Sequence, residues 1–72
     1  MSLMETTTER NLITADLVVR CQNCAKLLPQ LHTAMGRATT IRIGDGAATE
    51  LRRRGVLVPE AWEEVERKLE GI

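Results

Sequence analysis

Apolar residues recur at intervals of three and four positions through the first half of the chain, which is the spacing of one face of an α-helix. The positions are Ile13, Leu17, Cys21, Cys24, Leu28, Leu31 and Met35. The charged residues of the same stretch lie off this stripe. Pro29 removes a backbone hydrogen-bond donor, so we expect a helix over 8–28 and a shorter helix over 29–35 that ends at Gly36.

The middle of the chain has the clearest strand-like pattern. Residues 39–43 are rich in β-branched side chains and alternate in polarity, and a Gly-Asp-Gly turn signal follows at 44–46. A helix over 47–54 then ends at Gly55, and the apolar residues 56–58 form either a small strand or a buried connection. This part of the chain therefore predicts one or two short strands and one short helix.

A second apolar stripe begins beside Pro59, which opens the last helix. Its members are Val58, Trp62, Val65, Leu69 and Ile72. The expected fold is therefore mainly α with one or two short strands, a small α+β domain over residues 8–72. Residues 1–7 are polar and rich in threonine, and we expect them to be a disordered or cloning-derived tail.

Length and composition favour self-association. The chain has 72 residues, lacks Phe and Tyr, and has a single aromatic residue. A core of this size is marginal, and small apolar side chains bury little area each. Two exposed stripes would also form an apolar patch larger than soluble monomers usually show. We therefore expect a homodimer, with Leu17, Leu28, Leu31, Trp62, Val65 and Leu69 in its interface.

Charge is balanced over the whole chain but not along it. Ten basic and ten acidic residues give a net charge of zero, which provides no general attraction to a nucleic acid or a membrane. Arg52, Arg53 and Arg54 form the one consecutive basic cluster, a candidate contact for phosphates or for an acidic protein surface. The glutamate-rich last helix would repel phosphates, so a protein partner ranks before a nucleic acid.

The expected location is the cytoplasm. No stretch approaches the roughly 18 apolar residues of a membrane span, and the N-terminus lacks the charged and apolar regions of a signal peptide. Two cysteines three positions apart are too few and too close together to staple a secreted fold. We therefore expect no membrane association.

The two cysteines, Cys21 and Cys24, admit three interpretations. Both lie on the first apolar stripe, where free cysteine commonly acts as a small hydrophobic residue. Under this main interpretation neither thiol is catalytic, and the protein needs no cofactor. His32, beside the stripe, is then a surface or interface residue.

The second interpretation is thiol-disulfide chemistry, in which one thiolate attacks and a second thiol three residues later resolves the mixed disulfide. The CQNC motif followed by Pro29 resembles the active-site helix of the thioredoxin and glutaredoxin family. Residues 41–43 resemble the family's second strand, and residues 55–59 resemble the segment that carries its cis-proline.

This resemblance covers residues 21–59 and implies a truncated thioredoxin-like α/β fold. It would make Cys21 the nucleophile, Cys24 the resolving thiol and Pro59 a contact for the substrate backbone. The chain departs from the family after Pro59, because its last 13 residues are helix-like and supply no β-hairpin.

The third interpretation is a zinc site. Residues 19–28 resemble the first knuckle of the Com zinc-ribbon family of Mu-like phages, whose members are implicated in binding messenger RNA. The resemblance implies zinc as a cofactor and RNA as a partner. Zinc requires four ligands, so either His32 and Asp45, a poor ligand, would join Cys21 and Cys24, or two chains would share one metal through their two cysteine pairs.

These patterns together predict a small intracellular regulatory or adaptor protein that acts by binding a partner and has no catalytic activity. A thiol-disulfide oxidoreductase is the alternative, and a zinc-dependent RNA-binding protein is the third hypothesis. The exposure of the two cysteines distinguishes the binding protein from the oxidoreductase. A core cysteine is buried and unreactive, whereas a redox cysteine is accessible and has a lowered pKa.

Overall fold

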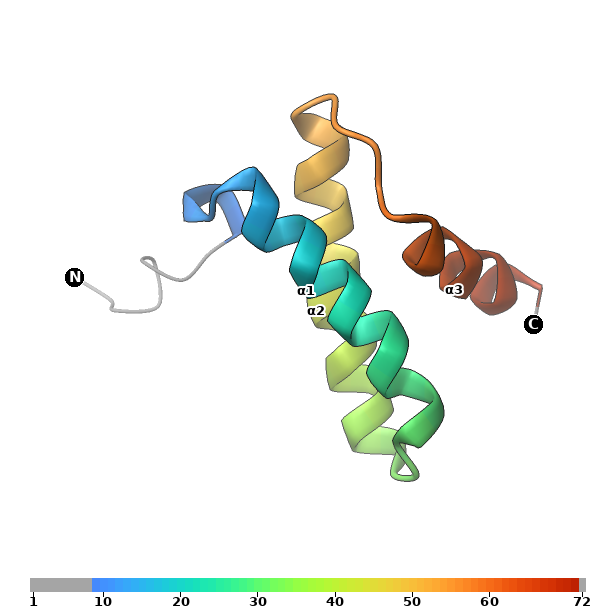
Figure 1. Ribbon diagram of the computed structural model, residues 1–72. Coiled ribbons are helices and arrows are strands. Elements are labelled where there is room, and N and C mark those ends of the chain that lie inside the picture. The colour runs from blue at the N-terminus through green and yellow to red at the C-terminus, as the bar shows by residue number, and fades with distance from the viewer. Residues whose placement is uncertain (1–8, 72) are drawn as a thin grey trace.

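The computed structural model describes residues 9–71, which form three α-helices (Figure 1). These are α1 (Thr14–Leu27), α2 (Ala34–Arg53) and α3 (Glu60–Glu70), with short 3-10 helices η2 (Glu9–Asn11) and η3 (Leu28–Gln30) before and after α1. The mainly α class is confirmed. The expected strands are absent from residues 9–71, and so is the sheet of a truncated thioredoxin-like fold. The tail expected at 1–7 lies outside the described residues.

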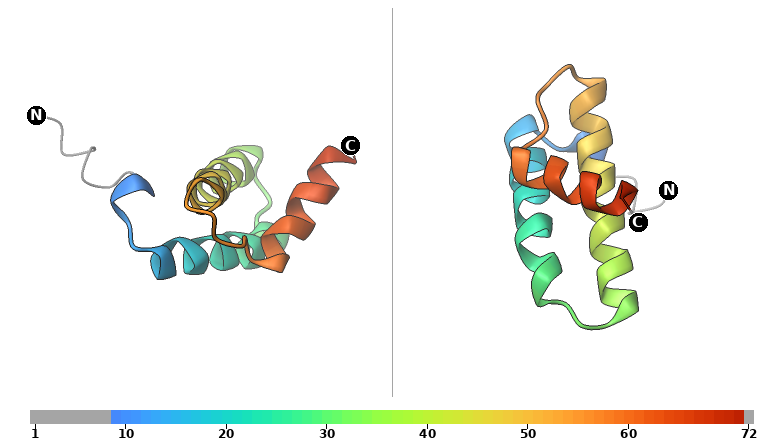
Figure 2. Two further views of the ribbon diagram at one scale, coloured as in Figure 1. Left: turned by 90° about the horizontal axis from the view of Figure 1, so that it is seen from above. Right: turned by 90° about the vertical axis from the view of Figure 1, so that its right-hand side faces the viewer.

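The helices α1 and α2 lie side by side and run in opposite directions, and α3 lies steeply across one face of this hairpin (Figure 2). The prediction of a helix with one buried face is confirmed for α1, because Leu17, Cys21 and Cys24 are buried along it and Leu28 continues the row. The helix begins at Thr14 rather than at residue 8. Ile13 stands at the N-cap position without a capping side chain.

The connection between α1 and α2 differs from the expected helix over 29–35. Pro29 lies in the first positions of η3, where its missing N–H breaks no bond. Thr33 then has extended backbone, and its Oγ1 accepts a hydrogen bond of 3.0 Å from the Gly36 N–H. Gly36 therefore belongs to the capped first turn of α2 instead of ending a helix.

The strand expected over 39–43 and the turn over 44–46 are wrong, because both segments lie inside α2. The face of α2 that packs on the rest of the molecule is made mainly of small residues, which obscures its helical period in the sequence. Its buried residues are Gly44, Ala47, Ala48, Glu50 and Leu51. Gly44 is required by packing, since a Cβ atom there would overlap the indole ring of Trp62.

The end of α2 follows the prediction that Gly55 closes a helix. Gly55 has a φ of 74°, which is a left-handed conformation that favours glycine. Its N–H donates to the Arg52 carbonyl at 3.0 Å, and the Val56 N–H donates to the Leu51 carbonyl at 2.9 Å. These two bonds are the pair that ends a helix in a Schellman motif. Residues 56–59 then cross to α3 as an extended connection.

One hydrophobic core joins the three helices. It consists of Leu17, Cys21, Cys24, Leu28, Ala47, Ala48, Leu51, Val58 and Trp62. Trp62 is its largest fully buried side chain. Within the described part of the chain, no helix is both long and apolar enough to cross a membrane.

Candidate functional site

A groove of about 740 Å³ lies between the hairpin and α3, and we call it the three-helix groove. It is bounded by the C-terminal half of α1 with η3, the N-terminal half of α2, and one side of α3. The lining residues are Gln22, Asn23, Ala25, Lys26, Leu28, Pro29, Arg37, Ile41, Ala61, Glu64, Val65, Lys68 and Leu69.

The apolar residues of this lining form a continuation of the core. Leu28 belongs to the core itself, and Ala25, Ile41 and Val65 are partly buried against it. Leu69 stands further out on α3 and is 38% exposed. The groove therefore presents apolar surface to solvent beside a core that is already complete.

Three basic side chains belong to the lining together with the apolar residues, one from each helix. Lys26, Arg37 and Lys68 are all exposed, and we call them the basic rim. Arg37 is held in place by a hydrogen bond of 2.9 Å from its Nη1 to the Leu28 carbonyl. None of the ion pairs found between described residues involves the basic rim. Glu64 is the only acidic residue in the lining.

The arginines expected to contact a partner form hydrogen bonds and ion pairs with other residues of the same chain, although Arg52 and Arg53 are exposed. Arg52 makes two hydrogen bonds to the Glu66 carboxylate, from Nη1 at 2.9 Å and from Nη2 at 2.5 Å, and so joins α2 to α3. This pairing holds the pKa of Glu66 below its ordinary value. Arg53 binds Glu50 in the same two-pronged way, through Nε at 2.9 Å and Nη2.

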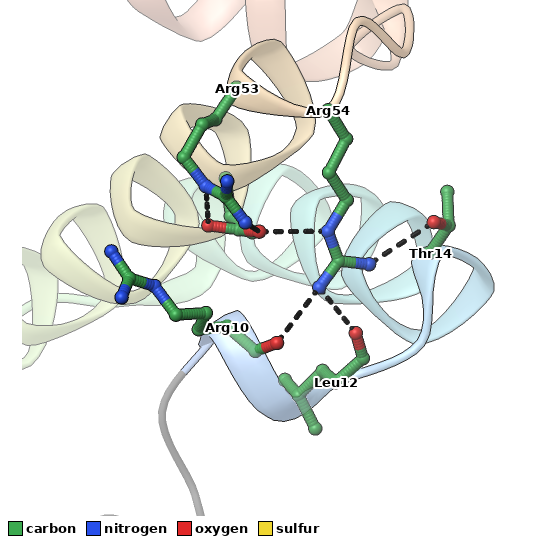
Figure 3. A network of polar contacts seen from close by, with 6 residues as sticks. Arg10, Leu12, Thr14, Arg53 and Arg54 are labelled. Atoms are coloured by element: carbon green, nitrogen blue, oxygen red, sulfur yellow. Dashed lines mark hydrogen bonds and ion pairs between the residues drawn. The ribbon is translucent and has the colours of Figure 1, made fainter.

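Arg54, at the end of α2, forms hydrogen bonds to residues 10–14 at the start of α1 and just before it. Its guanidinium binds the Glu50 carboxylate and donates to the Leu12 carbonyl at 2.6 Å and to Thr14 Oγ1 at 3.1 Å. Figure 3 shows the same side chain reaching the Arg10 carbonyl. Hydrogen bonds from Arg53 and Arg54 lower the pKa of Glu50 to about 2. These interactions give the arginines a structural role.

The cysteines lie where the main interpretation placed them. Cys21 is fully buried and Cys24 is 7% exposed. Burial is the main cause that raises the pKa of Cys21 to about 11, and the neighbouring Cys24 adds to it. Burial also raises the pKa of Cys24. The Cys21 Sγ lies 3.7 Å from the Gly44 carbonyl, to which its S–H donates. Both thiols are therefore protonated at neutral pH and poorly suited to act as nucleophiles.

The remaining candidate residues are dispersed over the fold. His32 is exposed in the connection before α2, and Asp45 is exposed on α2. Pro59 is the N-cap residue of α3, and its carbonyl accepts hydrogen bonds from Trp62 and Glu63. Over residues 9–71, no group of three His, Cys, Asp or Glu side chains is placed to hold a metal ion.

The expected interface residues divide into three groups. Leu17, Leu28 and Trp62 are buried in the core of a single chain, so their side chains offer little surface to a second copy. Val65 and Leu69 line the three-helix groove. Leu31 is half-buried beside η3.

Sequence reasoning missed the basic rim. Lys26, Arg37 and Lys68 lie in three separate segments of the sequence, and no motif joins them. The crossing of α3 over the hairpin brings them to one site, and no spacing rule within a single helix predicts that crossing.

Comparison with known proteins supplies no further information, since no family model, curated protein or solved structure matches this chain.

Proposed function

We propose that this protein is a small regulatory or adaptor protein that binds a segment of a partner protein in the three-helix groove and has no catalytic activity. The observation that carries the proposal is the apolar lining of the groove. Several of its residues pack against the buried core and remain partly open to solvent. A concave apolar site with a few polar groups at its edge is typical of places where a ligand or a helical segment binds.

The state of the cysteines supports a binding function over thiol chemistry. A redox pair needs an accessible thiol with a lowered pKa. Here both thiols are buried, and burial shifts the pKa of each in the opposite direction. Their place in the core is that of small hydrophobic residues.

The arginine cluster supports a protein partner over a nucleic acid. Phosphate binding depends on cations that are available to replace counterions. Arg52 and Arg53 already pair with Glu66 and Glu50, so binding phosphate would compete with these contacts. The groove lining also contains no aromatic residue on which a base could stack.

A cytoplasmic location belongs to the same proposal. The two cysteines are free thiols, and thiols persist in a reducing compartment. The argument for the homodimer expected from the sequence weakens, because one chain buries the middle of the first stripe and the start of the second in a shared core. We expect sedimentation equilibrium at micromolar concentration to give the mass of one chain, whereas a stable dimer mass would restore the earlier expectation.

Photocrosslinking in the native cell tests the proposal. A photoreactive amino acid at Lys68, on the groove, should form a discrete adduct with one protein. The same group at Leu57, which is 90% exposed and outside the groove, is the matched control and should not. No adduct at position 68, or the same adduct at both positions, would contradict the proposal.

A further inference from the structure

We infer that the occupant of the three-helix groove is an amphipathic helix of another protein whose apolar face is flanked by Asp or Glu residues. This inference rests on the proposed function and names the class of partner. The inference follows from two features of the groove taken together, the basic rim and the apolar lining. Either feature alone would be compatible with many kinds of ligand.

The first argument is local charge. The whole chain has a net charge of zero, yet the groove lining has three basic residues and only one acidic residue. The basic rim has one member from each of α1, α2 and α3, so each of the three helices brings a positive charge to the groove. A partner with carboxylates at its edges would be attracted to this site, and a basic partner would be repelled.

The second argument is that no carboxylate forms an ion pair with the basic rim within the described residues. Arg52 and Arg53, which stabilise the fold, each form a bidentate ion pair with a carboxylate of the same chain. Lys26, Arg37 and Lys68 form no such ion pair. Arg37 donates to a carbonyl through Nη1, which orients the guanidinium without cancelling its charge.

The third argument concerns shape. Residues 61–69 of α3 extend along the groove for about 12 Å, at about 1.5 Å per residue, which matches about two turns of a bound helix. An extended strand has no pairing site here, because residues 9–71 contain no sheet edge. An amphipathic helix satisfies its own backbone and inserts its apolar side chains, as in other helix-in-groove complexes.

A second copy of this chain fits the groove poorly. A two-fold dimer that paired one groove with the other would bring the two basic rims together, and their positive charges would repel. The acidic helix α3 of a second copy cannot supply an apolar face either, because Trp62, Val65 and Leu69 of that helix already face its own core and groove.

A selection experiment tests this inference. Purified full-length protein selects from a displayed library of helices of about 14 residues, with Leu fixed at the apolar positions and Glu, Gln or Lys varied beside them. We expect enrichment of Glu. The best acidic peptide should bind about tenfold more weakly to the double variant Lys26→Glu and Lys68→Glu, because two attractions become repulsions.

The matched control is the double variant Arg42→Glu and Arg67→Glu. Both residues are exposed, lie outside the groove lining and give the same change of net charge. It should bind the acidic peptide as the wild type does. An equal loss in both double variants would mean general charge attraction and would overturn the inference.

The possible failures are distinguishable. Helices that compete for the groove without any preference for Glu would overturn the acidic partner and leave the proposed function intact. Failure to select any helix that protects position 68 from photocrosslinking would count against both claims. Binding of laurate in the groove without any helix would assign the site to an anionic amphiphile and overturn the inference.

Discussion

At the scale of single residues, the molecule depends on small side chains where close approach is needed. Gly44 lies against the ring of Trp62, and Cys21 lies against the same turn of α2. With a single aromatic residue in the chain, the core gains its density from these contacts rather than from large rings. Two predictions follow at this scale.

Replacing Gly44 with Ala should destabilise the protein. The added methyl group overlaps the Trp62 ring, and overpacking of this kind costs about 1–3 kcal/mol. The gain in helix propensity from Gly to Ala, about 0.5–1 kcal/mol, offsets only part of this cost. Urea denaturation measures the free energy of unfolding. Gly71→Ala is the control, because a Cβ there makes ordinary contact at 3.4 Å, and it should be nearly neutral. Equal stability of the Gly44 variant and the wild type would show that Trp62 does not pack as described.

The thiols should resist alkylation in the native state. Burial and the raised pKa of Cys21, about 11, leave almost no accessible thiolate at pH 7.5. Iodoacetamide followed by mass spectrometry should find no modified cysteine in the folded protein and two in denaturant. Rapid native modification of Cys21 would revive the thiol-disulfide hypothesis.

At the scale of elements, the sequence predicted α1, α3 and the stop at Gly55, because each has an uninterrupted apolar period or a clear end signal. It failed in α2. There the β-branched residues of 39–43 and the glycines that follow resemble a strand and a turn, although the buried face of small residues packs as a helix. Tertiary packing against Trp62 overrides the local preference.

The end of α2 is held by ionic contacts that depend on pH. Glu50 has a pKa of about 2 in the folded state, below its ordinary value of 4.5, so its contribution to stability is complete above pH 4.5 and is lost as the pH falls toward 2. Glu66 contributes in the same direction. The urea midpoint should therefore stay constant from pH 7 to pH 5 and then fall. Glu50→Gln should lower stability at neutral pH and reduce the acid-induced fall. An unchanged pH profile in this variant would exclude the described Glu50 contacts.

At the scale of the whole molecule, the groove arises only from the way α3 crosses the hairpin. The core residues of α1 and α3 were predictable because each of these two helices carries its own apolar stripe, whereas the core residues of α2 were not. The groove was not, since Lys26, Arg37 and Lys68 meet only in the folded chain. The same folding engages Arg52 and Arg53 in internal ion pairs, which moves the candidate contact surface from the arginine cluster to the basic rim.

The most direct test uses the partner protein that is captured by crosslinking at position 68. Its affinity is measured for two matched variants of this chain. Leu69→Asp places a charge in the apolar lining, and Leu57→Asp makes the same change at an exposed site outside the groove. Isothermal titration calorimetry should show a loss of affinity of at least about tenfold for Leu69→Asp, as expected when a charge replaces an apolar contact within an interface, and no change for Leu57→Asp. Unchanged affinity of the Leu69 variant, with its fold verified by circular dichroism, would contradict binding in the three-helix groove.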